Sequence, residues 1–112
     1  MEIDFLDSIK AERDEQKKQF GITLREAIKL GDLSGTDAEQ FDQIEKEVGE
    51  LNKECRAKAA ELDTLRTTDK DEYVSQMADL CDYEAKAFSK LTGRLRALVQ
   101  EIKLRRASRT LS

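Results

Sequence analysis

Two cysteines, Cys55 and Cys81, are the most reactive side chains of this 112-residue sequence. No histidine accompanies them, so the sequence lacks the base of Cys–His and Ser–His–Asp catalysis and the His ligands of mixed zinc sites. Two thiolates also leave zinc short of the four ligands of a structural site. Because free cysteine is among the most buried residue types, we expect both to fill core positions. A redox-sensitive disulfide or a shared metal site is the alternative.

Acidic residues are numerous but match no motif that binds a cation or a phosphate. The EF-hand loop needs glycine at its sixth position and glutamate at its twelfth, and the stretch that starts at Asp32 provides neither. A glycine-rich phosphate loop with Gly-Lys-Ser/Thr is also missing. We therefore expect no metal, no cofactor and no catalytic residue, and we rank an enzyme last among the possible functions.

Basic residues gather at the end of the sequence. From Phe88 to Ser112 there are seven Lys or Arg against Glu101 alone, a net charge of +6. The first 87 residues hold 13 basic and 23 acidic residues, a net charge of −10. Such a basic stretch can bind an acidic protein, a nucleic acid or an anionic membrane surface, or pair with acidic parts of its own chain. The candidate partner- or anion-binding residues are Arg94, Arg96, Lys103, Arg105, Arg106 and Arg109.

Ser108 is a candidate phosphorylation site. It follows Arg105-Arg106-Ala107, the arrangement of two arginines ahead of a serine that basophilic kinases favour. A phosphate at this position would cancel part of the basic charge around it.

The composition leaves open whether the chain folds. It is 39 % charged with a mean hydropathy of −0.69, values that are also typical of disorder. The apolar residues, however, recur at helical spacing over long stretches, and the absence of proline permits uninterrupted helices. We therefore predict an all-α fold, an elongated three-helix bundle or antiparallel coiled-coil hairpin with long helices.

The compartment is predicted from what the sequence lacks. No apolar run approaches the roughly 20 residues of a membrane span, and the acidic, charged start does not resemble a signal peptide. Two cysteines without a secretory signal fit a reducing setting. We expect a cytoplasmic, intracellular protein.

Two breaks divide the sequence into three helical segments. Gly31–Gly35 is a cluster of loop formers, and Thr36 with Glu39 has the spacing of a capping box that starts the next helix. The second break is 67–69, where either Thr68, with Asp71, or Asp69, with Glu72, can cap the third helix. We predict helices over about 2–30, 36–66 and 69–106 in a single domain of residues 1–106, with 107–112 as a frayed basic tail. Gly21 could kink or split the first helix.

The second and third helices are predicted to form an antiparallel hairpin. Apolar residues of the second helix follow a heptad seam from Phe41 to Leu65. Folding the chain back near residue 68 pairs residues whose numbers sum to about 136. Four apolar layers then coincide: Leu62 with Val74, Cys55 with Cys81, Val48 with Phe88, and Phe41 with Leu95. The third helix is apolar over so wide an arc that it should face two neighbours.

The first helix is predicted to lie parallel to the third, with residue n near residue n+70. Apolar residues close its two ends, Ile3, Phe5, Leu6 and Ile9 at one and Phe20, Leu24, Ile28 and Leu30 at the other. No apolar residue larger than alanine lies between them from Glu12 to Gln19. At that level we expect Arg13 to pair with Glu84.

These features favour a non-catalytic protein–protein interaction module: a helical-bundle subunit, an adaptor or a small assembly chaperone of a larger complex. Ile22, Leu104 and Leu111 are apolar residues that we expect on the surface, where a partner could bind. That partner would be another protein, helical itself, or a second copy of this chain, with which the first helix could pair. Binding to nucleic acid or membrane headgroups through the basic C-terminal end of the third helix is the alternative. No motif assigns the sequence to a family.

Overall fold

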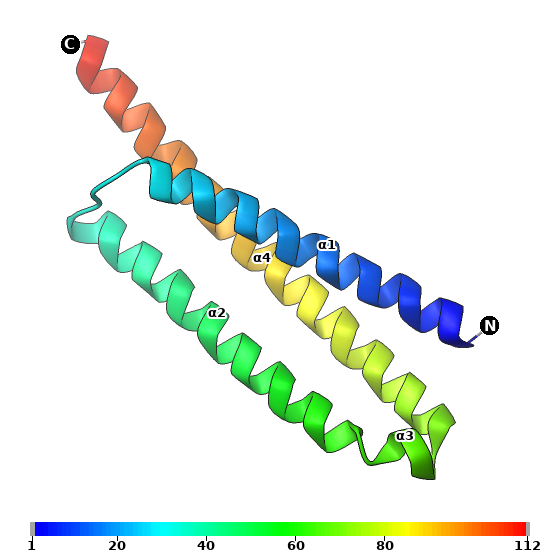
Figure 1. The fold of residues 1–112 in the computed structure, drawn as a ribbon. Helices are drawn as coiled ribbons and strands as arrows, with labels where there is room; N and C mark the ends of the chain where they lie inside the picture. Colours follow the sequence, from blue (N-terminus) through cyan, green and yellow to red (C-terminus); the bar gives the residue numbers. More distant parts are fainter. Residues whose placement is uncertain (1, 112) are drawn as a thin grey trace.

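The computed structural model describes the backbone of residues 2–111 and the side chains of residues 4–109. This part of the chain forms four helices: α1 (Glu2–Lys29), α2 (Gly35–Leu62), α3 (Leu65–Thr68) and α4 (Lys70–Leu111). The three long helices form an elongated body of 65 × 24 × 16 Å (Figure 1). The predicted all-α fold is confirmed.

The first break is made by glycine conformations. Gly31 (φ +83°) and Gly35 (φ +58°) lie in the left-handed region that glycine adopts without steric cost. Because α2 begins at Gly35, Thr36 lies inside its first turn and Ser34 takes the N-cap position. The predicted start at about residue 36 agrees with Gly35 within one residue, but the predicted Thr36 cap is wrong, since the N-cap lies two residues earlier. The other glycine in question, Gly21, does not interrupt α1.

The second break comes four residues earlier than predicted, because α2 ends at Leu62 instead of residue 66. Threonine hydroxyls bond to backbone carbonyls here: Thr64 Oγ1 donates to Glu61 O (3.2 Å) and Thr68 Oγ1 to Thr64 O (2.9 Å). Such local bonds compete with a continuing helix, and only the short α3 follows. Asp69 then accepts the Glu72 N–H at 3.2 Å, so Asp69 and not Thr68, the other predicted candidate, caps α4.

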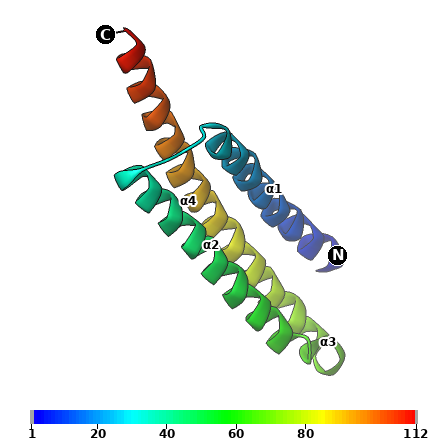
Figure 2. The ribbon, with the colours of Figure 1, turned by 60° about the vertical axis from the view of Figure 1, so that its left-hand side comes forward.

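The end of α4 differs from the prediction. We expected the helix to stop at 106 and residues 107–112 to fray, but α4 continues to Leu111, and Ser112 lies outside the described residues. The sequence after Ile102 contains no glycine or proline and is rich in Lys, Arg, Ala and Leu, which favour helix. Figures 1 and 2 show this last part of α4 projecting beyond the other helices.

α4 is the central helix of the body. It runs parallel to α1 and antiparallel to α2, and both pack along it (Figures 1 and 2). The rings of Phe20 and Phe88 meet edge to face at 5.9 Å between centroids, an offset of 68 residues, close to the predicted 70. The prediction that the last helix faces two neighbours is confirmed.

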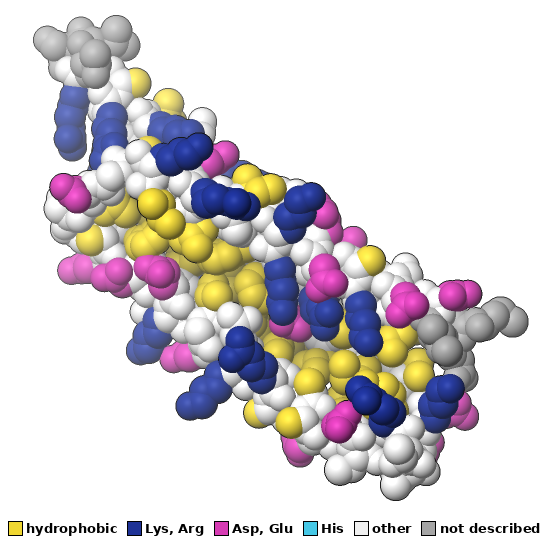
Figure 3. Space-filling model, in the orientation of Figure 1, with side chains coloured by type: hydrophobic (Ala, Val, Ile, Leu, Met, Phe, Trp, Pro, Cys, Tyr) yellow, Lys and Arg dark blue, Asp and Glu magenta, His cyan; other side chains and the backbone are white. Residues whose placement is uncertain are grey.

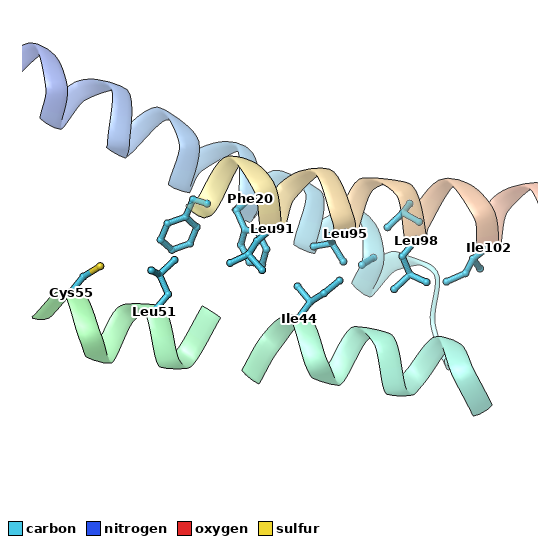
Figure 4. Packing of buried hydrophobic residues seen from close by; sticks show 11 residues of the cluster. Phe20, Ile44, Leu51, Cys55, Leu91, Leu95, Leu98 and Ile102 are labelled. Carbon is cyan, nitrogen blue, oxygen red and sulfur yellow. The ribbon is translucent and has the colours of Figure 1, made fainter. Parts of the chain in front are cut away.

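The buried apolar residues form two clusters. The loop-end cluster lies near the α1–α2 loop, where Ile44 and Leu51 of α2 point toward α4 (Figure 4). The α3-end cluster lies at the opposite end of the body. The loop-end cluster consists of Phe20, Ala27, Ile44, Leu51, Cys55, Phe88, Leu91, Leu95, Leu98, Val99 and Ile102, and the α3-end cluster of Leu6, Leu62, Val74, Met77, Ala78 and Cys81.

The clusters agree with three of the four predicted layers. Leu62 and Val74 share the α3-end cluster, while the Val48–Phe88 and Phe41–Leu95 layers belong to the loop-end cluster. The layer of Cys55 and Cys81 is divided, because each cysteine belongs to a different cluster.

Candidate functional site

A groove lies between α1 and α2 with α4 as its floor. Both helices pack on α4 but scarcely touch each other. Helices that pack directly have axes about 8–10 Å apart, so α1 and α2 are separated by more than this. Figure 3 looks into this open groove and shows two stretches of hydrophobic side chains, with basic side chains between them. The bundle is therefore closed on two sides of α4 and open between α1 and α2.

The loop end of the open groove is apolar. It has a volume of about 450 Å³, and Ile28 on its α1 wall is 63 % exposed. We expected Ile28 to be a core residue, and this prediction is wrong because no part of α2 covers this side of α1. Phe5, predicted to close the other end, is likewise 58 % exposed, and the side chain of Ile3, predicted to lie beside it, is outside the described residues. The lining of this end consists of Ala27, Ile28, Gly31, Asp32, Leu33, Ala38, Phe41 and Asp42.

The α3 end of the open groove has a different charge. Its volume is about 480 Å³, and its charged lining is three basic residues against one acid, whereas the loop end has two acids and no base. The apolar part comes from α2, Tyr73 and Met77. The lining of this end consists of Lys10, Arg13, Ala59, Ala60, Asp63, Arg66, Tyr73 and Met77.

A charged cluster separates the two apolar ends. Glu84 of α4 is 5 % exposed, and its carboxylate forms an ion pair with the Lys17 ammonium at 2.8 Å. The Arg13 guanidinium lies farther from the carboxylate, at 3.9 Å. The predicted Arg13–Glu84 pair is therefore present, but Lys17 is the closer partner. Arg13 also donates to the Cys81 sulfur at 3.4 Å, and the Lys17 ammonium lies 5.6 Å from the centre of the Phe88 ring.

Two of the six candidate anion-binding residues pair with acids of α2. Arg94 binds Glu47 at 2.8 Å, and Arg105 binds both carboxylate oxygens of Asp37, the shorter contact being 2.7 Å. Hydrogen bonds from these guanidinium groups lower the pKa of Glu47 and of Asp37 below the ordinary values. Pairing with acidic parts of the same chain, one of the options that the sequence left open, thus applies to Arg94 and Arg105.

The other four candidates lie in different surroundings. Arg106 donates to the backbone carbonyls of Leu30 and Asp32 in the α1–α2 loop, and Arg109 has electrostatic partners too. Arg96 and Lys103 are exposed, and neither has an ion-pair partner among the described side chains. The structure therefore does not bring the six together into one anion-binding pocket; it distributes them around α4.

The candidate phosphorylation site is accessible. Ser108 is exposed on the projecting part of α4, within one turn of Arg105 and Arg106. Leu104, also on this part, is 64 % exposed, and Ile22 of α1 is 38 % exposed, as predicted for both; the side chain of Leu111 lies outside the described residues.

The two cysteines are buried, and no disulfide joins them. Burial raises the pKa of Cys55 to about 11 and also raises the pKa of Cys81, against the effect of the nearby Arg13 guanidinium. A raised pKa leaves little of the reactive thiolate at neutral pH. The expectation that both fill core positions is confirmed.

The described residues hold neither a cluster of metal ligands nor a helix that could span a membrane. No three His, Cys, Asp or Glu side chains among them are placed to hold a metal ion together. None of the described helices has an apolar stretch of the length that a bilayer crossing needs. Comparison with known proteins adds nothing to this: no family model, curated protein or solved structure matches the chain.

The groove residues are not evident in the sequence, because helical spacing alone predicts burial for them. Ile28 follows Leu24 at helical spacing, which is the pattern of a core residue. Phe41 was assigned to the seam with α4, and it also lines the groove.

Proposed function

We propose that this chain is a non-catalytic protein–protein interaction module, a helical-bundle subunit, adaptor or small assembly chaperone, and that a helix of a partner protein binds in the open groove. The observation that carries the proposal is that α1 and α2 pack on α4 and not on each other. α1, α4 and α2 thus occupy three corners of a four-helix arrangement, and the groove is the place of the fourth.

The groove favours an amphipathic helix as its occupant. Its loop end offers apolar contacts from Ile28, Leu33 and Phe41, and such grooves bind helices through apolar residues spaced three and four apart. Asp32 and Asp42 at this end favour basic residues beside the apolar stripe of the partner. Lys10, Arg13 and Arg66 favour acidic residues at the opposite end of the same helix. The charges therefore select one orientation of the partner.

The proposal is tested with a photo-reactive amino acid placed at position 28 in one sample and at position 22 in another, in cells of the natural source. Ile22 is the matched control, an exposed isoleucine on the same helix outside the groove lining. We expect a partner protein cross-linked from position 28 and not from position 22. Cross-linking of this chain to itself would instead identify a second copy as the occupant and contradict a heteromeric partner.

Binding of the purified partner then measures the contribution of the groove. Ile28→Asp removes an apolar contact and places a charge in the interface, so we expect at least about tenfold weaker binding in calorimetry. Ile22→Asp should leave the affinity unchanged. Equal effects of the two substitutions, or no effect of either, would exclude the groove as the binding site.

Binding of nucleic acid or membrane headgroups by the basic end of α4 is the alternative, and the contacts favour it less. Arg94 and Arg105 already bind carboxylates of α2, so an added anion must compete with them. Arg96 and Lys103 remain exposed for such contacts. An affinity for DNA or anionic vesicles that falls steeply with salt and is lost on removal of residues 103–112 would support this alternative.

A further inference from the structure

A second surface, distinct from the open groove, extends along α2 and α4 on the side that α1 does not reach. Three shallow grooves of about 590, 280 and 310 Å³ follow one another along it, and all their lining residues belong to α2 or α4. We call this surface the α2–α4 face. Figure 2 shows the two helices side by side over this length.

The largest groove of the α2–α4 face lies toward the α3 end and has an apolar floor. Ala57 and Leu80 line it, together with the ring of Tyr83, which is 48 % exposed. The Tyr83 hydroxyl donates to the Glu54 carboxylate at 3.3 Å, which holds the ring along the groove. An exposed aromatic ring beside an apolar groove is typical of a protein interface.

An apolar side chain that suits this groove lies at the other end of α4. Leu104 is 64 % exposed and follows Ala97, which lines the third groove, at heptad spacing. Leu104 is 24 residues from Leu80, about 36 Å along the helix at 1.5 Å per residue. One copy therefore presents an apolar projection and an apolar groove on α4, separated by a fixed distance.

The α3 end of the α2–α4 face and the projecting part of α4 carry opposite charge. Residues 61–82 contain seven acids and two bases, and all seven acids are exposed. The projecting part of α4 after Ile102 contains four bases and no acid. The acids of the first segment are Glu61, Asp63, Asp69, Asp71, Glu72, Asp79 and Asp82, and the bases of the second are Lys103, Arg105, Arg106 and Arg109. Within the same chain Arg105 also pairs with Asp37, and Arg106 donates to the α1–α2 loop.

We propose that two copies of this chain associate antiparallel through their α2–α4 faces, so that the basic end of α4 of each copy lies on the acidic α3 end of the other. A two-fold axis between the copies makes this contact twice and closes the dimer. The same alignment brings Leu104 of each copy to the groove lined by Leu80 and Tyr83 of the other. A parallel pair would place like charges together at both ends, which costs free energy.

The dimer is tested by sedimentation equilibrium of the full chain over a hundredfold concentration range. We expect a species of twice 12.8 kDa that dissociates on dilution and more readily at high salt. A mass of 12.8 kDa at every concentration would overturn the proposal.

Substitutions locate the interface. Leu104→Glu, and Glu61→Lys combined with Asp79→Lys, should each weaken the dimer at least about tenfold, since each removes a contact that is made twice. The controls are Ile22→Glu and Glu26→Lys on α1, which make the same kinds of change outside the face. Circular dichroism of each variant checks that it stays helical. Equal weakening by the controls would contradict the α2–α4 face as the interface.

A charge exchange provides the most specific test. Lys103→Glu combined with Arg109→Glu should weaken the dimer, as Glu61→Lys combined with Asp79→Lys does. A chain with both ends reversed regains opposite charges across the interface, so its dissociation constant should return to within about threefold of the native value. Failure of this rescue would show that the ends do not meet. Because these residues lie outside the open groove, the outcome is independent of the partner cross-linked from position 28.

Discussion

The two ends of the molecule differ in how they are packed, although the same three helices build both. At the loop end, the cluster around Leu95 joins residues of α1, α2 and α4 and includes the Phe20–Phe88 ring contact. At the α3 end, the described cluster is smaller, and its contacts from α1 come from Leu6 and Ile9. Glu84 with Lys17 and Arg13 stands between the two.

The larger cluster is the part of the molecule that can hold a binding surface rigidly. The apolar part of the open groove, with Ile28 and Phe41, lies over the larger cluster. A groove on a well-packed base keeps its shape before the partner arrives, which reduces the ordering that binding requires. The α3 end has fewer buried contacts and is expected to open more easily.

Truncation of one core leucine at each end has the largest expected effect and tests the comparison directly. Leu95 is fully buried in the larger cluster, so Leu95→Ala should lower the free energy of unfolding by about 3–4 kcal/mol. Leu62 is 3 % exposed in the smaller cluster, so Leu62→Ala should lower the free energy of unfolding by about 2–3 kcal/mol. Urea denaturation measures both. A larger loss for Leu62→Ala would reverse the assignment of the stronger end.

Changing Glu84 should alter the boundary between the clusters. Glu84→Ala removes the carboxylate that Lys17 and Arg13 bind and leaves a small cavity, at a cost of about 1–2 kcal/mol. Glu84→Leu fills that space and joins the clusters, while the two cations reach water, so stability should stay within about 1 kcal/mol of native. Equal losses for Ala and Leu in thermal unfolding would mean that the ion pairs stabilise the fold more than packing does.

The alkylation rate of each cysteine measures how readily its own cluster opens. With a pKa of about 11, Cys55 should react with iodoacetamide at about pH 8 at least a hundredfold more slowly than in urea. Cys81 lies in the smaller cluster and should be modified first, despite its full burial. Mass spectrometry of the peptides gives the order. Earlier modification of Cys55 would contradict the comparison.

Acid should weaken the loop end slightly, which is the smallest expected effect. The pKa values of Asp37 and Glu47 are lowered by their arginine partners, so their stabilisation is complete above the ordinary values of 3.8 and 4.5 and is lost as the pH falls through the lowered pKa values. A chain with Asp37→Asn and Glu47→Gln should lose less stability than native between about pH 5 and pH 2. Urea midpoints at both pH values measure this. An unchanged pH dependence would show that these two ion pairs do not stabilise the fold.

The sequence predicted the helices and their pairing better than their ends. Heptad spacing gave the antiparallel α2–α4 hairpin, because a seam must face one neighbour over its whole length. The ends depended on competing local bonds, such as those of Thr64 and Thr68, which spacing does not reveal. Ile28 was assigned to the core because spacing shows which side of a helix is apolar and not whether a neighbour covers it. The basic residues were identified, but their acceptors on α2 required the register of the folded chain.

Amide hydrogen exchange along α4 tests most directly the claim that the groove lies on the more stable half. It is measured on the isolated native chain at low concentration, where every amide of one continuous helix is compared. We predict that amides between about residues 88 and 102 exchange near the global unfolding rate, and that those between about 74 and 81 exchange at least tenfold faster. Equal protection along the helix, or stronger protection at the α3 end, would contradict the account.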